Sequence, residues 1–239
     1  MPCSHRRALL TLLALMAGTP ALWAQTKERT KVVLYKDRLA AQFDTVNCVK
    51  NVVKANPLLF LRGELPFFYE RALTPKLSLE VGVGVTFRDY LSFSLGGQTA
   101  SADYGAGTTI VPRLSYHVGA RFYLTDDLEP QGWYLQFAMA HLEYVTDITE
   151  KNSDGQFSDR TLRDERIFND LRGLFGFQML SGTSNWLIDF YGGLGMRFRD
   201  MTIVTERTDL ATSQWTYTTE QVDDIVPVLY AGFKVGLGF

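Results

Sequence analysis

The chain has 239 residues, and its 24 basic and 26 acidic side chains give a formal net charge of −2. A charge this close to neutral argues against nucleic acid as a partner, because nucleic acid selects strongly basic surfaces. Hydrophobic residues make up 46% of the chain, but beyond the signal-like start no apolar run reaches the length of a spanning helix, about 20 residues. Hydrophobicity dispersed in this way, with 13% aromatic residues and 20 glycines, favours strands with one apolar face.

Residues 1–24 have the three parts of a secretory signal peptide. Arg6 and Arg7 form a basic start, residues 8–17 are apolar, and the small residues that follow form a cleavage region. The apolar run is too short to span a membrane, so we expect cleavage at the end of this stretch. Cys48 would then be the single cysteine of the exported chain, without a partner for an intramolecular disulfide.

Residues 25–50 have weak patterning, and we interpret them as a periplasmic lead-in. Residues 31–35 would form a short strand, and Asp37 to Phe43 a helical turn or two. The main domain is expected over residues 51–239.

From residue 51 onward, apolar side chains recur at every second position. Successive side chains of a strand point to opposite faces, so this period predicts strands with one apolar and one polar or small face. The alternation slips near Ala140 and His141, which predicts a β-bulge there. The predicted strands are residues 53–61, 65–73, 77–88, 110–124, 132–147, 170–179, 186–199 and 226–239.

The connections between these strands alternate in length. Those after the second, fourth and sixth strands are short, and those after the third, fifth and seventh are long; the tight link at residues 62–64 is an exception. Outer-membrane barrels have an even strand number, short periplasmic turns and long external loops. We therefore predict an all-β fold, an eight-stranded antiparallel up-and-down transmembrane β-barrel. A ten-stranded barrel would need two strands from residues 25–50, and a soluble sandwich would not sort its connections in this way.

The last strand carries a more specific pattern. Its apolar face ends in Phe233, Val235, Leu237 and Phe239, which resembles the C-terminal assembly signal of bacterial outer-membrane β-barrels. Aromatic residues cluster at predicted strand ends, as in the girdles of such barrels. They are Trp133, Trp186 and Phe239 at the periplasmic side, and Phe87, Tyr90, Phe168 and Phe198 at the external side.

Three short motifs extend this resemblance. Residues 51–59 (NVVKANPLL), residues 69–73 (YERAL) before a proline turn, and Gly132-Trp-Tyr resemble small outer-membrane barrels of Bacteroidota, of the OmpA/OmpX-like barrel class. The resemblance implies a multi-pass barrel in a bacterial outer membrane. Its expected partners are membrane lipid, lipopolysaccharide and the barrel-assembly machinery.

Alternation also places many charged side chains on the inner face. A barrel of about eight strands is only wide enough to be filled by side chains. An unpartnered buried ion costs several kcal/mol, so we interpret these charges as a plug of ion pairs; an ion path or a polar ligand site is the alternative. The residues are Glu70, Glu80, Arg88, Arg113, His117, Arg121, Asp170, Arg172, Asp189, Arg197 and Lys234.

Motifs for catalysis and metal binding are weak. His117 and His141 are the histidines outside the signal-like segment, Glu143 lies near the second, and no serine stands in a Gly-x-Ser-x-Gly motif. Residues 150–155 resemble the opening of a calcium loop, but Thr161 stands where the loop requires a bidentate Glu. We therefore expect no catalytic residue, no cofactor and no metal site.

The predicted function is a non-enzymatic barrel of structural or adhesive type. The alternatives are a barrel that binds a small hydrophobic or lipid ligand, as OmpW-like barrels do, and a lipid-modifying enzyme. Residues 201–225 continue the alternation on both sides of residues 209–212, which predicts a hairpin that extends the last two strands. The exposed edge of such a ribbon would accept a strand from a surface protein partner; the alternative is a mobile loop shielded by lipopolysaccharide sugars.

Overall fold

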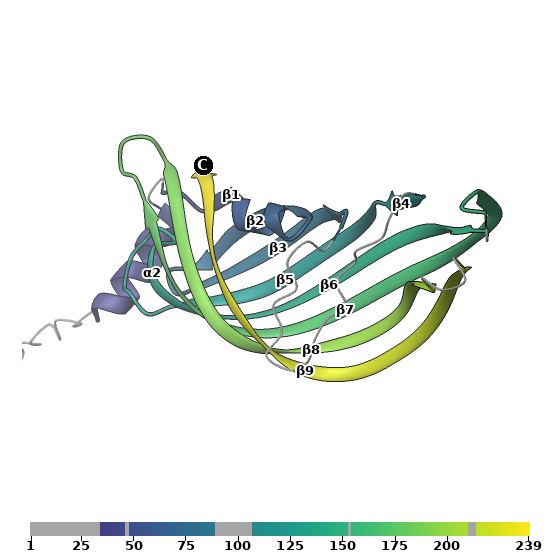
Figure 1. The fold of residues 1–239 in the computed structure, drawn as a ribbon. Helices are drawn as coiled ribbons and strands as arrows, with labels where there is room; N and C mark the ends of the chain where they lie inside the picture. Colours follow the sequence, from purple (N-terminus) through teal and green to yellow (C-terminus); the bar gives the residue numbers. More distant parts are fainter. Residues whose placement is uncertain (1–33, 46–47, 89–106, 153, 210–213) are drawn as a thin grey trace, which may run out of the picture. The chain divides into compact units, whose positions relative to one another are not determined.

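The computed structural model describes residues 34–45, 48–88, 107–152, 154–209 and 214–239, which belong, apart from Leu34, to one compact unit, Tyr35–Phe239 (Figure 1). The predicted signal peptide, most of the short strand predicted at 31–35, Tyr90 and the hairpin turn at 210–212 lie outside the described residues. Within the described part, no helix is both long and apolar enough to cross a membrane.

The described residues fold into one antiparallel sheet of nine strands in a ring-like arrangement, with two helices. The prediction of an all-β, antiparallel fold is confirmed. The helices are α2 (Tyr35–Thr45) and α3 (Pro57–Leu61); the strands are β1 (Asn51–Ala55), β2 (Glu64–Thr74), β3 (Leu77–Thr86), β4 (Thr108–Val111), β5 (Arg113–Tyr123), β6 (Gly132–Lys151), β7 (Phe157–Leu180), β8 (Trp186–Asp209) and β9 (Gln214–Gly238).

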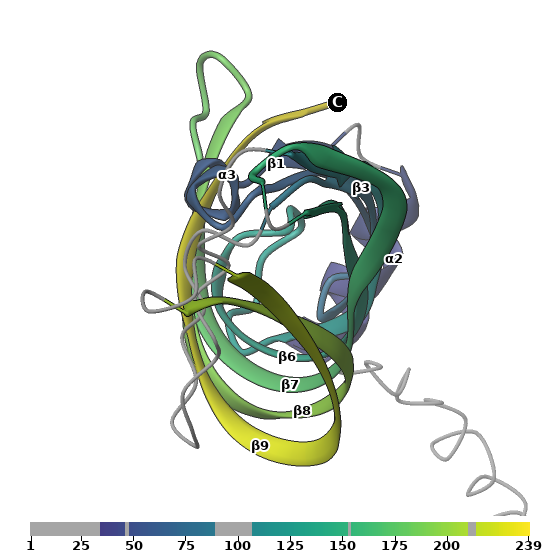
Figure 2. The same cartoon turned by 45° about the vertical axis from the view of Figure 1, so that its right-hand side comes forward.

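Strand pairing runs around the ring and returns to its start. The neighbours follow the order β6-β5-β3-β2-β1-β9-β8-β7, and β7 pairs in turn with β6. β4 pairs with β6 beyond the end of β5. Figure 2 shows β6 to β9 curving around one side of the ring, with β1 and β3 on the other.

The strand predicted over residues 110–124 is divided at Pro112 into β4 and β5, which is why the sheet has nine strands. Proline has no backbone N–H to donate to a ladder. Between the pairs Val111↔Val145 and Tyr116↔His141, the chain advances by five residues from β4 to β5 but by four residues along β6. The β4–β5 segment therefore contains one extra residue. The bulge predicted in β6 at Ala140–His141 was wrong, because β6 pairs with β7 through these positions without a shift. The extra residue is on the neighbouring β4–β5 segment instead.

The first predicted strand, residues 53–61, was also wrong in its second half. β1 ends at Ala55 and a short helix, α3, follows. Asn56 caps this helix by accepting a hydrogen bond from the N–H of Leu58 at 3.1 Å, and Pro57 stands at its first position, where proline is favoured. Gly63, at φ +79°, follows the cap Arg62 and turns the chain into β2.

Burial along the strands is inside out relative to a soluble protein. Large apolar side chains point outward and are exposed, among them Phe137 (75%), Met139 (65%) and Leu194 (63%), whereas most inward positions are buried and many are polar. Phe168 was expected in the external aromatic girdle, but it is buried, because its position alternates inward with Asp170. The four residues of the assembly-like signal point outward, with Leu237 and Phe239 exposed.

The interior side chains form layers that follow one another along the axis of the ring. An apolar floor of Val49, Val52, Leu180 and Leu187 lies near the carboxyl end of the chain. Beyond it come two polar layers, described below, and then an apolar cluster of Ala140, Leu142, Tyr144, Phe168, Met201 and Ile203.

The longest strands form two hairpins. β8 and β9 pair without interruption from Trp186↔Leu237 to Asp209↔Gln214, so the predicted extension of the last two strands into a hairpin is confirmed. It meets the β6–β7 hairpin, where Nζ of Lys151 lies 2.8 Å from Oε1 of Glu206. The helical turn predicted between Asp37 and Phe43 is part of α2, whose Leu39 and Phe43 are buried.

Candidate functional site

Six buried charges form a compact network in the first polar layer. We call Lys54, Arg121 and Lys234, with Glu70, Glu80 and Asp189, the ion cluster; the three cations balance the three anions. Arg121 Nη2 lies 2.6 Å from Oε2 of Glu80, and its Nη1 lies 2.9 Å from Oδ2 of Asp189. Lys234 Nζ lies 2.6 Å from Oε1 of Glu80. Lys54 contacts Glu70 directly and lies 3.3 Å from Asp189.

Neutral side chains complete the hydrogen bonding of the ion cluster. The hydroxyl of Tyr134 donates to Asp189 at 2.5 Å, and that of Tyr123 donates to Glu70 at 2.7 Å. Gln178 Oε1 accepts from both Lys54 and Arg121, at 2.6 and 2.7 Å. Burial of charge is tolerated where each ion is both paired and hydrogen-bonded, and the ion cluster meets both conditions.

The second polar layer is centred on Asp170. Arg197 donates to both of its oxygens, at 2.7 and 2.8 Å, and Arg172 adds a third bond at 2.7 Å. Nearby, Glu64 Oε1 lies 2.5 Å from Nε2 of His117. Two guanidinium groups therefore share the carboxylate of Asp170, and Glu64 is a second buried acid at this level.

Most of the interior residues predicted from the sequence are buried in these two layers. Nine of the eleven are buried: Glu70, Glu80, His117, Arg121, Asp170, Arg172, Asp189, Arg197 and Lys234. Arg113 is outside them, at the first position of β5, with a side chain that is 36% exposed and whose Nε lies 3.1 Å from Oε1 of Glu143. Arg88 lies beyond the end of β3 and is half-buried.

Sequence reasoning missed several members of the network. Lys54 has the parity of an interior position but is absent from the predicted interior charges, and Glu64 was predicted in the tight link at residues 62–64. Gln178 and Tyr134 also alternate inward and hydrogen-bond to the ion cluster, but they are neutral and so were not among the predicted interior charges. The period of two would have identified these residues if inward positions of every polar type, and not only charged ones, had been included.

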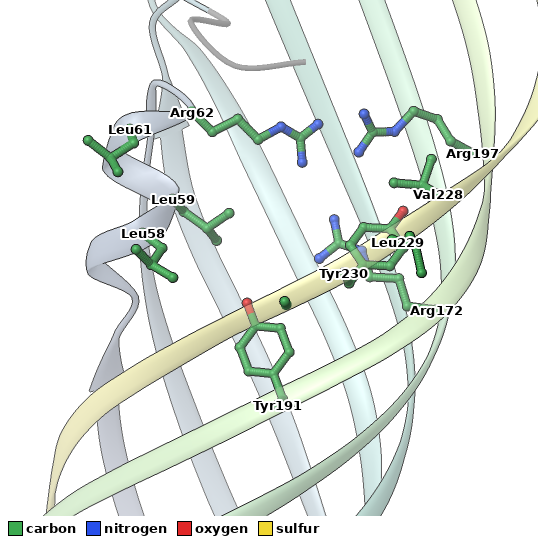
Figure 3. Close-up of a pocket in the computed structure, with 11 residues that line it drawn as sticks. Leu58, Leu59, Leu61, Arg62, Arg172, Tyr191, Arg197, Val228, Leu229 and Tyr230 are labelled. Carbon is green, nitrogen blue, oxygen red and sulfur yellow. The ribbon is translucent and has the colours of Figure 1, made fainter. Parts of the chain in front are cut away.

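A cavity of about 470 Å³ lies between α3 and β9 (Figure 3). Leu58, Leu59 and Leu61 of α3 are on one side of it. Its polar lining consists of Arg62, Arg172, Tyr191, Arg197 and Tyr230, so the cavity touches the second polar layer.

The cavity lies where the wall of strands is incomplete. β1 pairs with β9 only from Val52↔Gly238 to Ala55↔Val235, and α3 then replaces the strand. Among the described residues, no strand pairs with this edge of β9 beyond Val235. The cavity is therefore bordered by an unpaired strand edge on one side and a short helix on the other.

Neither of the two histidines that the structure describes is hydrogen-bonded to a serine hydroxyl. Ser115 donates to Glu64 at 2.9 Å, the same oxygen that His117 contacts, so the imidazole does not activate the serine as in a catalytic triad. His141 lies on the outer face, stacked on Tyr116 and 2.7 Å from Asn169 Oδ1. Across the described ranges, no group of three or more His, Cys, Asp or Glu is arranged to hold a metal ion.

Comparison of the chain with protein-family models, with curated proteins and with solved structures gives no match. The resemblance to small outer-membrane barrels therefore rests on the sequence motifs alone. The features of the molecule that bear on function are the ring, the inside-out burial, the ion cluster and the cavity.

Proposed function

We propose that the protein is a non-enzymatic β-barrel of a bacterial outer membrane, with a structural role in the envelope. In this proposal, β4 and β5 are two parts of one barrel strand interrupted at Pro112, so eight strands cross the membrane. The observation that carries the proposal is the inside-out burial: exposed apolar side chains surround a charged interior. A soluble monomer rarely exposes so large a continuous apolar surface, whereas lipid requires one.

The height of the apolar surface supports this placement. On β7, the outward positions from Met179 to Leu171 are apolar or glycine, and Asn169 follows. On β6, the outward positions from Trp133 to Met139 are apolar, and His141 follows. A tilted barrel strand crosses the hydrocarbon core with about 9–11 residues, so the band on β7 has a suitable length.

The filled interior supports a structural role instead of a channel. The ion cluster, the Asp170 layer and the apolar cluster follow one another along the axis of the ring and fill its interior. The wide pores of porins also need 16 or more strands. We expect purified protein to be heat-modifiable in detergent and to give no sustained porin-sized current in planar bilayers. Recovery of most of the protein in the soluble periplasmic fraction would contradict the membrane placement, and stable large currents would contradict the closed interior.

An adhesive role is a second candidate, favoured by the β8–β9 hairpin. β7 pairs with β8 only as far as Glu165↔Thr202, and the hairpin continues to Asp209↔Gln214. Among the described residues, no strand pairs with the hairpin's outer edges in this extension. Such edges support the addition of a strand from a protein on a neighbouring or host cell.

Shortening the β8–β9 hairpin tests the adhesive role. Replacement of residues 203–220 by a short Gly/Ser turn should reduce binding of whole cells to the partner surface by about tenfold, because the extended edges are removed. The matched control replaces residues 150–158 at the tip of the β6–β7 hairpin. Equal binding by wild type and the shortened β8–β9 variant, both at normal surface levels, would reject adhesion through this hairpin.

A further inference from the structure

We propose that the cavity between α3 and β9 binds one anionic single-chain amphiphile, a long-chain fatty acid. Its carboxylate would lie on Arg172 and Tyr230, and its alkyl chain would leave across the edge of β9 among the leucines of α3. The proposal rests on the membrane placement proposed above only for the source of the ligand, because the cavity itself is a property of the folded chain.

The lining of the cavity indicates that it opens through the wall. Val228 and Tyr230 are on the inward face of β9, whereas Leu229 and Ala231 are on its outward face, yet all four line the same cavity. Residues on opposite faces of one strand can share a cavity only if the cavity wraps around the strand's edge. The edge of β9 is unpaired here because β1 ends at Ala55. An elongated ligand would therefore extend from the interior to the outer surface.

The interior end of the cavity suits an anion. Its lining includes Arg62, Arg172 and Arg197 and no acidic residue among those described. These three arginines outnumber the two buried acids near them, which are Asp170, shared by two of the arginines, and Glu64. A further carboxylate would thus meet a positive environment, and arginine favours planar oxyanions because its N–H groups match their geometry.

Arg172 and Tyr230 lie together at this end of the cavity, with the guanidinium carbon of Arg172 at 4.6 Å from the centre of the Tyr230 ring. Arg172 is 9% exposed, and its Nε has no hydrogen-bond partner among the described residues. Buried donors are normally satisfied, so Arg172 has capacity for a further acceptor.

The outer end of the cavity suits a hydrocarbon chain. Leu58, Leu61 and Leu229 line it and are 41%, 59% and 55% exposed. A volume of about 470 Å³ is within the usual range for small-ligand sites, about 300–1,000 Å³, and is filled by one chain more readily than by a multi-chain lipid. Charge at one end and exposed leucines at the other together favour a single-chain fatty acid.

The test measures displacement of a fluorescent long-chain fatty acid from the purified, folded protein in an uncharged detergent, with protein-free micelles as the blank. Palmitate should displace the probe at a concentration at least tenfold lower than hexadecanol or hexadecyltrimethylammonium, because only palmitate pairs with the arginines. Equal displacement by palmitate and hexadecanol would overturn the anion site. Stronger displacement by lysophosphatidic acid would assign the site to a phosphate and overturn the fatty-acid proposal.

Three variants locate the site. Ala231→Phe fills the outward part of the cavity and should weaken palmitate at least tenfold; Ala120→Phe adds the same bulk to the exposed face of β5 and should not. Tyr230→Phe removes only the hydroxyl and should weaken palmitate about tenfold, as expected for loss of a hydrogen bond to a charged group. Wild-type affinity in both Ala231→Phe and Tyr230→Phe would overturn the proposal. Membrane fractionation tests the barrel proposal independently. A negative result in the fatty-acid binding assay would therefore not contradict the barrel proposal.

Discussion

Replacement of Arg121 by Met should lower the free energy of unfolding by about 3–5 kcal/mol, the cost of leaving a buried charge without its partner. Arg121 contacts all three acids of the ion cluster: Glu70, Glu80 and Asp189. Its loss leaves two cations for three anions, and all five side chains are buried. The measurement is urea unfolding in phospholipid vesicles, followed by the heat-modifiable band.

A second substitution separates charge balance from simple loss of packing. Glu80→Gln removes one anion, so the double variant Arg121→Met, Glu80→Gln restores equal numbers of cations and anions. We expect the double variant to be clearly more stable than the sum of the two single effects predicts. Strict additivity of the two effects would contradict a network held together by charge.

The matched control is an ion pair at the surface. Arg163 donates to Asp147 at 2.8 Å in the extended part of the β6–β7 hairpin, with the arginine side chain 54% exposed. The hydrogen bond from Arg163 holds the pKa of Asp147 below its usual value, so the pair persists at neutral pH and weakens as the pH falls through that lowered value. Water screens such a pair, so Arg163→Met should have a much smaller effect than Arg121→Met. Equal effects would contradict the proposed role of burial.

Most strands of the sheet and their inward faces could be predicted from the sequence, because both depend on the local alternation of side chains. A period of two identifies the face of each residue without knowledge of its neighbours, and it placed Glu80, Arg121 and Asp189 on the inner face. The helix α3 had a local signal as well, since an Asn-Pro pair marks a helix start, but the alternation through residues 53–61 masked it. Local patterns thus predicted the faces of the strands correctly but extended the first strand beyond its end at Ala55.

The contacts of the candidate site could not be predicted in the same way. Lys54 meets Glu70, 16 residues away, and Asp189, 135 residues away, and both contacts depend on the register of strands around the whole ring. The cavity depends on where the β1–β9 ladder stops, which no period in the sequence specifies. Arg113 shows the same limit, because it is on the inward parity but stands at the first position of β5, where its side chain is 36% exposed.

The outward face provides the second large effect. Phe137 is 75% exposed and lies between Trp133, at one end of the apolar band, and the polar His141 beyond the other. Near the middle of a bilayer, an arginine on the lipid face of a barrel costs about 2–4 kcal/mol. Phe137→Arg should therefore lower the free energy of unfolding in vesicles by this amount and reduce the fraction of protein in the outer membrane.

The same substitution has the opposite meaning for a protein in water, where replacing an exposed Phe by Arg is neutral or improves solubility. Phe157→Arg is the matched control, because Phe157 is 53% exposed at the tip of the β6–β7 hairpin, beyond the apolar band. We expect Phe157→Arg to retain wild-type stability and membrane levels. If the two variants behaved alike, with both fully stable, the apolar face around Phe137 would not be in contact with lipid, and the membrane proposal would fail on the observation that carries it.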